Sequence, residues 1–256
     1  MGERFWYQTD ASEMKRRWKL TQEVMKKEGV DALFFGGYDK WCCGITKYLT
    51  DLAVWNYPHY FLFSEQGISA FGHAGWDQPG IQPYAIKSDF FIDNVGIPTL
   101  PSTCYGDDWY PEKIAGYIRK YGYKKIGYAG FYTIPAPFYK YFAERLSEVE
   151  FVNFTDQIDH IKAVKSEWEI AEFTKCVYMH DQIMAGVSAY LRPGRTEREV
   201  SRIIRTLADD IGCPELNILA GTDPATPNLQ PYVYQNLTIG KQDYFYLLIE
   251  LAGPGG

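Results

Sequence analysis

The sequence lacks the long apolar segment that a membrane-spanning helix requires. The apolar run at residues 244–249 holds only six residues, whereas a spanning helix needs roughly 20. The first residues, MGERFWYQTD, contain no apolar core of the kind that a signal peptide carries. We therefore expect a protein that neither crosses a membrane nor is secreted.

Cysteine is scarce, and its spacing does not suggest pairing. The five cysteines are odd in number, and none of them forms a CxxC motif. Such a set does not predict a disulfide framework. Because a signal peptide is also missing, the sequence predicts a cytoplasmic protein with reduced thiols.

No run of lysine or arginine is long enough to form a basic patch. The chain has 26 basic and 32 acidic residues, which gives a formal net charge of −6 and an isoelectric point near 5.3. Proteins that bind nucleic acid or anionic membranes usually present clustered positive charge. The charge pattern therefore argues against a nucleic-acid partner.

Several common catalytic motifs are missing as well. None of the four histidines stands in an HExxH motif or in a Cys/His zinc spacing; they are His59, His73, His160 and His180. No GxGxxG string joins a strand pattern to a helix pattern, and neither a GxSxG elbow nor a P-loop is present. The sequence thus argues against a closed zinc site, a dinucleotide-binding fold and a serine-hydrolase elbow.

Residues 1–158 alternate between helical and strand patterns. A helical spacing begins at Asp10, in a sequence typical of a capping box, and ends before an apolar run at residues 30–35 that is typical of a strand covered on both faces. Two strand-like runs, residues 60–63 and 68–71, flank a loop of hairpin length. The first part of the chain is therefore predicted to be an α/β domain with a mixed sheet.

The pattern changes at Ser166, where a capping box precedes a helix that is predicted to continue to Leu191. A Pro-Gly pair breaks this helix, and Thr196 opens a second capping box and a second helix. Two strand candidates follow, at residues 216–220 and 244–251. We expect a second, α+β domain that starts at residue 159 and continues to residue 256.

Aromatic residues make up 17% of the chain and crowd the stretch from Trp41 to Phe61. They can pack a small sheet through cross-strand aromatic pairs. They can also form an exposed surface for a subunit contact or a substrate, since tyrosine and tryptophan offer a large apolar area with a polar group. Both explanations stay open here. On the second one, Trp41, Tyr48 and His59 are candidate substrate-binding residues.

Two segments of the second domain resemble the creatinase, prolidase and aminopeptidase P family. Residues 161–170, IKAVKSEWEI, are similar to the segment that opens the family's catalytic domain, and residues 191–200, LRPGRTEREV, to the segment that joins its first two helices. Residues 45–50, ITKYLT, also look like a segment of the family's N-terminal domain. The resemblance spans most of the chain. It implies an N-terminal α/β domain followed by an incomplete pita-bread catalytic domain.

The resemblance also implies an activity and a set of site residues. Family members hydrolyse C–N bonds, usually as dimers; the peptidases use two divalent metals, while creatinase works without metal. Asn228 aligns with a functional histidine of the family, and Glu250 aligns with its first metal-binding aspartate. An asparagine amide cannot shuttle a proton near neutral pH as imidazole does. The other ligands would lie beyond Gly256.

We therefore expect the N-terminal portion of a cytoplasmic, homodimeric hydrolase whose substrate is a small amide, a guanidino compound or a proline dipeptide. Its candidate catalytic residues are Asn228 and Glu250. The chain by itself is expected to bind no metal pair and to be inactive. The alternative is a non-catalytic dimerisation or small-molecule-binding module that retains the fold.

Overall fold

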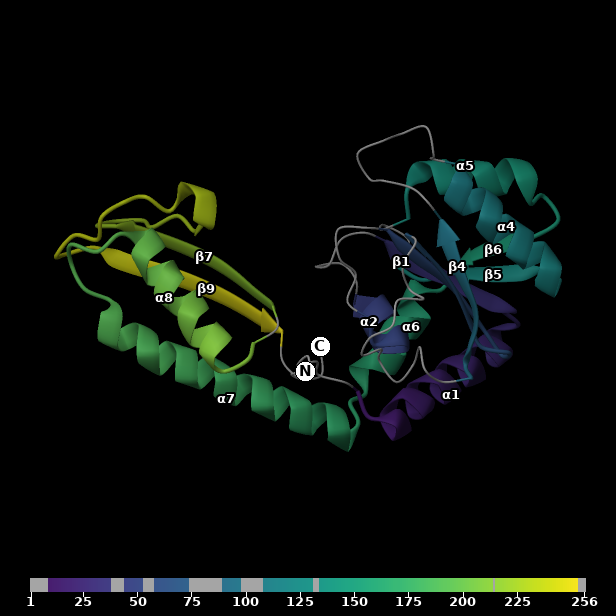
Figure 1. The fold of residues 1–256 in the computed structure, drawn as a ribbon, viewed down its shortest axis with the longest axis horizontal. Helices are drawn as coiled ribbons and strands as arrows, with labels where there is room; N and C mark the ends of the chain where they lie inside the picture. Colours follow the sequence, from purple (N-terminus) through teal and green to yellow (C-terminus); the bar gives the residue numbers. More distant parts are fainter. Residues whose placement is uncertain are drawn as a thin grey trace, which may run out of the picture. The chain divides into compact units, whose positions relative to one another are not determined.

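The computed structural model divides the chain into two compact units, Met1–Val164 and Lys165–Gly256. It describes residues 9–37, 44–52, 58–73, 89–97, 108–130, 134–213 and 215–252. The sequence placed the boundary after residue 158, a position that helix α6 (Thr155–Ala163) spans. Each unit is described by itself below (Figure 1).

The first unit contains a six-stranded sheet with the order β4-β3-β2-β1-β5-β6 (Figure 1). The strands are β1 (Ala32–Gly37), β2 (His59–Ser64), β3 (Ile68–His73), β4 (Phe91–Ile97), β5 (Lys125–Tyr128) and β6 (Glu150–Asn153). β1 pairs antiparallel with β2 and parallel with β5. β2 and β3 form the expected antiparallel hairpin. The predicted mixed sheet is therefore confirmed.

Helices cover both faces of this sheet. One face packs against α1 (Ala11–Glu28), α2 (Gly44–Thr50) and α6, and the other packs against α4 (Trp109–Tyr121) and α5 (Ala136–Arg145). Along β1, Leu33 and Phe35 point into the first core, while Ala32 and Phe34 point into the second. Every residue of β1 and β2 is buried, which explains the uninterrupted apolar run in β1.

The aromatic residues of β2 serve this packing. Phe61 stacks on Phe35 with ring centroids 5.3 Å apart, and Tyr60 lies 4.5 Å from Phe138. Both β2 side chains are almost fully buried. The packing explanation is therefore confirmed for these two aromatic residues.

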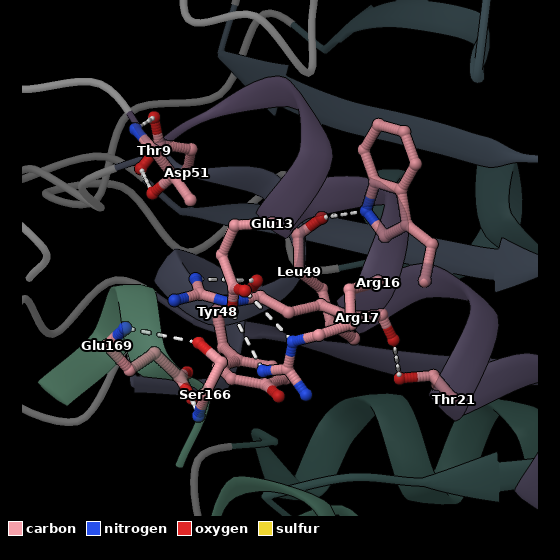
Figure 2. A network of polar contacts seen from close by, with 11 residues as sticks. Thr9, Glu13, Arg16, Arg17, Thr21, Tyr48, Leu49, Asp51, Ser166 and Glu169 are labelled. Atoms are coloured by element: carbon pink, nitrogen blue, oxygen red, sulfur yellow. Dashed lines mark hydrogen bonds and ion pairs between the residues drawn. The ribbon is translucent and has the colours of Figure 1, made fainter.

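The start of α1 differs from the prediction. Asp10 precedes the helix, but its side chain makes no capping hydrogen bond. The Glu13 carboxylate instead accepts hydrogen bonds from Arg16 and Arg17 (Figure 2). Charged partners offer this buried carboxylate stronger hydrogen bonds than a backbone amide does. The predicted capping box at Asp10 is wrong for this reason.

The described residues of the second unit form two α-helices, a short 3₁₀ helix and a three-stranded sheet with the order β8-β7-β9 (Figure 1). Its elements are α7 (Glu167–Tyr190), α8 (Glu197–Asp210), β7 (Glu215–Asp223), β8 (Gln230–Pro231), the 3₁₀ helix η3 (Tyr232–Tyr234) and β9 (Tyr244–Ala252). Both predicted capping boxes are present: the Ser166 and Thr196 side chains each accept a hydrogen bond from a backbone amide of their helix. The continuous helix after Ser166 is confirmed.

A single core lies between the two helices and one face of this sheet. Its buried members include Ile183 and Val187 of α7, Val200 and Ile204 of α8, and Ile218 of β7. The buried carboxylate of Glu197 ties α8 to the sheet, because it accepts hydrogen bonds from the backbone amides of Thr222 at 2.8 Å and Leu237 at 3.3 Å.

Within the ranges described above, no helix has both the length and the apolar character needed to cross a membrane.

Candidate functional site

The two faces of β9 have different surroundings. Phe245, Leu247, Ile249 and Leu251 pack against the core of the second unit. Successive side chains of a strand point to opposite faces, so Tyr244, Tyr246, Leu248 and Glu250 lie on the other face. Tyr244 is 61% exposed and Tyr246 is 51% exposed, and Glu250 is exposed too. We call this side the open face of the sheet.

Glu250 is held on the open face by a neighbouring strand. It lies directly opposite Asn217 of β7. The Asn217 Nδ2 atom donates a hydrogen bond of 2.7 Å to Glu250 Oε2. The next pair on the same face is Leu219 opposite Leu248, both half-buried. A pair formed by an amide and a carboxylate and a pair of leucines therefore lie side by side, about 7 Å apart along the strands.

Asn228 reaches the open face through the loop between β7 and β8. A Cβ atom on Gly221 would lie 2.1 Å from the backbone oxygen of Asn228. Gly221 is on the same face of β7 as Asn217, so the missing side chain makes room for the loop to cross that face. Asp223 shapes the loop by accepting hydrogen bonds from the amides of Ala225 and Thr226, and these lower the pKa of its carboxyl.

The structure does not bring Asn228 and Glu250 together. Asn228 lies beside Gly221, whereas Glu250 lies opposite Asn217, four residues away along β7. Four residues of a strand span roughly 13 Å, which is too far for the two side chains to share one water molecule. Tyr246 lies opposite Gly221 and is therefore level with Asn228. A ligand on this face would meet Glu250 at one end and Asn228 with Tyr246 at the other.

The candidate substrate residues of the first unit are less accessible. Tyr48 is buried, and the Arg17 guanidinium lies 4.4 Å from the centre of its ring (Figure 2). His59 is also buried, at the start of β2 between Gly37 and Gly72. Trp41 lies outside the described residues. A substrate role for these three residues remains a prediction.

The donor atoms of the open face do not fit a pair of divalent metals. Over the part of the chain that the structure describes, no group of three or more His, Cys, Asp or Glu side chains is arranged to hold a metal ion. A two-metal site needs several fixed ligands to hold both ions. Glu250 and the Asn217 amide supply too few.

Sequence reasoning missed Asn217, Leu219 and Tyr246. The alternation along residues 244–251 could have placed Tyr246 on the same face as Glu250, since both are at even positions. Nothing local in the sequence pairs Asn217 with Glu250, because the register of β7 against β9 depends on the long-range packing of both strands.

Comparison with solved structures shows which proteins share this fold. An Xaa-Pro dipeptidase from Bacillus anthracis matches with a TM-score of 0.67 and 14% identity, over 94% of this chain and 61% of that one. An X-Pro aminopeptidase from Thermotoga maritima matches with a TM-score of 0.70 and 11% identity, over 92% of this chain and 64% of that one. A prolidase from Thermococcus sibiricus matches with a TM-score of 0.69 and 14% identity, over 95% and 66%.

The chain shares their fold. The predicted resemblance to prolidases and aminopeptidase P is confirmed at that level, for an α/β first unit followed by pita-bread elements. The chain spans about 60% of the length of the first structures it matches. No family model and no curated protein matches the sequence.

Proposed function

We propose that this chain forms the substrate-binding part of a hydrolase for C–N bonds in small amides, with Xaa-Pro dipeptides as the substrate class. The fold shared with Xaa-Pro dipeptidases supports the proposal. The observation that carries it is the Asn217–Glu250 pair on the open face, 2.7 Å apart and next to the Leu219–Leu248 pair. The solved structures that share this fold are longer than this chain. We therefore propose hydrolysis for the whole protein and substrate binding for this chain.

The two pairs suit the two parts of an Xaa-Pro dipeptide. Its proline ring is apolar and can pack on Leu219 and Leu248. The amide bond is next to that ring. With the ring on the leucine pair, the amide can face Glu250, because the Asn217–Glu250 pair is about 7 Å from the leucine pair. Glu250 can accept a proton from a water molecule at this position, and the hydrogen bond from Asn217 orients its carboxylate. Asn228 has no group that titrates near neutral pH, so its role is to bind the far end of the ligand.

Calorimetric titration of glycyl-proline into the 256-residue chain tests the binding step. We expect Glu250→Gln to weaken binding at least tenfold, because it removes the negative charge that can pair with the glycyl ammonium beside the amide. Asp209→Asn is the matched control: it removes one exposed carboxylate of the same unit, on α8, and should leave the affinity unchanged. Prolyl-glycine, with its ring at the other end, should bind more weakly than glycyl-proline. No binding, or equal weakening by both variants, would contradict the proposal.

Metal content is a second test of the same site. After chelator treatment, the chain should bind fewer than two ions when Mn²⁺, Co²⁺ or Zn²⁺ is added separately, because the open face has too few fixed ligands. Two tightly bound ions per chain that are lost in Glu250→Ala would show that Glu250 belongs to a metal centre that the proposal does not include.

A non-catalytic module that binds small molecules is the second candidate. It is favoured by Asn228, which stands in the loop where the resemblance places a functional histidine. If the whole protein binds glycyl-proline but releases no free proline in a chromatographic assay, this second function replaces the first.

A further inference from the structure

The open face is longer than a dipeptide. Its side chains form rows about 7 Å apart, because every second residue of a strand points to the same face. Three of these rows are pairs of residues that lie opposite each other on β7 and β9: Asn217 with Glu250, Leu219 with Leu248, and Gly221 with Tyr246. An extended dipeptide spans roughly 7 Å. Bound in the way proposed above, glycyl-proline covers the first two rows and does not reach the third.

The third row has an aromatic ring on one strand and a backbone segment on the other. Gly221 has no side chain, and the backbone of Asn228 lies where its Cβ atom would be. The loop therefore blocks the β7 side of this row. Tyr246, on β9, is 51% exposed, and within the described residues its ring stacks on no other aromatic ring. A ligand that continues past the leucine pair is thus directed over β9 and onto the ring of Tyr246.

An extended peptide repeats with the same period as these rows. Its residues advance about 3.4 Å each, and its side chains point alternately to two sides. When the proline ring packs on the leucine pair, the next side chain points away from the sheet and the one after that points toward it. This second side chain after the proline is about 7 Å further along, level with Tyr246. An aromatic side chain there can stack on the Tyr246 ring, since aromatic pairs prefer ring centres roughly 4.5–7 Å apart.

We propose that Tyr246 is a specificity-determining residue for peptides that begin with Xaa-Pro and carry an aromatic residue two positions after the proline. The register comes from the proposed function, on which this specificity rests, because it places the proline ring on the leucine pair. Tyr246 binds the part of the peptide beyond the Xaa-Pro amide bond and takes no part in proton transfer at that bond.

Two tetrapeptides of the same composition test the register. Gly-Pro-Ala-Phe places its aromatic ring level with Tyr246, whereas Gly-Pro-Phe-Ala places the ring one residue earlier, on the side that points away from the sheet. Calorimetric titration into the 256-residue chain should show roughly fivefold tighter binding of Gly-Pro-Ala-Phe, because a stacked aromatic pair contributes more than its buried area. Gly-Pro-Ala-Ala, which has no ring, should bind about as weakly as Gly-Pro-Phe-Ala.

Substitutions at the ring assign the preference to Tyr246. Tyr246→Ala should remove the difference between the two isomers, and Tyr246→Phe should keep it because the ring remains. Tyr244→Ala is the matched control: residue 244 is 61% exposed on the same face of β9, one row further along, and its loss should leave the preference unchanged. Tyr246→Ala should also leave the affinity for glycyl-proline unchanged within about twofold. Circular dichroism of each variant reports whether the fold is retained.

The result with glycyl-proline separates a failure of this specificity from a failure of the proposed function. If glycyl-proline binds and the two isomers bind equally, or if the preference survives Tyr246→Ala, the role of Tyr246 is overturned and the proposed function stands. If neither glycyl-proline nor any of the tetrapeptides binds, the proposed function is wrong and the role of Tyr246 is overturned with it.

Discussion

The two units of this chain use their sheets in different ways. In the first unit, both faces of the six-stranded sheet are covered by helices, and β1 and β2 are buried along their whole length. In the second unit, one face of the three-stranded sheet packs on α7 and α8, while the other presents Tyr246 and Glu250 to solvent. A sheet covered on both faces contributes stability, whereas an open face leaves polar and aromatic groups available for a ligand.

The largest expected effect comes from the core of the first unit. Phe34 is fully buried, and its ring contacts those of Tyr60, Phe138 and Phe142. Phe34→Ala should lower the free energy of unfolding by about 3–5 kcal/mol, through lost burial and the cavity left behind. Tyr244→Ala, on the open face, should cost less than about 0.5 kcal/mol. Urea unfolding measures both, and similar losses would erase the contrast between the two units.

A second effect concerns the buried carboxylate of Asp51, which lies after α2 with a φ of 58°. It accepts hydrogen bonds from the backbone amide and hydroxyl of Thr9 (Figure 2) and from Lys47 Nζ. Asp51→Ala should cost about 2–4 kcal/mol, because buried donors lose their acceptor. Asp51→Gly should cost about 1 kcal/mol less, since glycine adopts this left-handed backbone conformation without strain. If thermal unfolding showed the same loss of stability for Asp51→Ala and Asp51→Gly, the backbone conformation at residue 51 would not be strained.

Smaller effects are expected at the helix caps of the second unit. Ser166→Ala and Thr196→Ala should each lower the stability of that unit by about 1 kcal/mol, because each removes one capping hydrogen bond. Ser188→Ala, an exposed serine inside α7, serves as the control and should change stability by only a few tenths of a kcal/mol. If Ser188→Ala lowered the stability as much as Ser166→Ala or Thr196→Ala, the loss could not be attributed to the capping hydrogen bonds.

The smallest expected effect is on how the stability of the first unit depends on pH. Burial alone would raise the pKa of Asp93, but hydrogen bonds from Tyr121, Lys120 and Ser69 outweigh it and lower the pKa below its ordinary value of 3.8. A lowered pKa in the folded state adds stability above the unfolded pKa, and this is lost as the pH falls through the folded value. Asp93→Asn should therefore reduce the acid sensitivity of unfolding slightly: the Asp93 side chain is only 14% exposed, but its partner Lys120 is 52% exposed, and solvent screens the pair. An unchanged slope between pH 5 and pH 2 would contradict this.

Local signals predicted the elements that combine strong periodicity with capping chemistry. The helix after Ser166, the hairpin β2–β3 and the strand β9 all follow from patterns within a few residues. Helix α2 lacked such a signal, because its β-branched residues Ile45, Thr46 and Thr50 favour a helix only weakly. It forms where Leu49 is buried and its carbonyl accepts a hydrogen bond of 2.7 Å from Trp18 Nε1. Helix α2 therefore depends on tertiary contacts rather than on local helix propensity.

Strand β4 was missed for a similar reason. Its sequence, FIDNVGI, contains Asp93, Asn94 and Gly96, which are uncommon in strands. The strand is stabilised by parallel pairing with β3 and by the hydrogen bond from Ser69 to Asp93. Glu250 as a site residue was proposed from the sequence alone and stays a prediction. Its contact with Asn217 joins residues 33 positions apart and depends on the sheet register.

The most direct test of the open face as a binding site is an amide NMR titration of the chain with glycyl-proline. We expect chemical-shift changes at Asn217, Leu248 and Glu250, and none at Phe34 or Phe61 in the first unit, whose sheet is covered by helices on both faces. Glu250→Gln should remove those changes at the same dipeptide concentrations. Shifts confined to the first unit, or shifts that persist unchanged in Glu250→Gln, would contradict the assignment of the site to the open face.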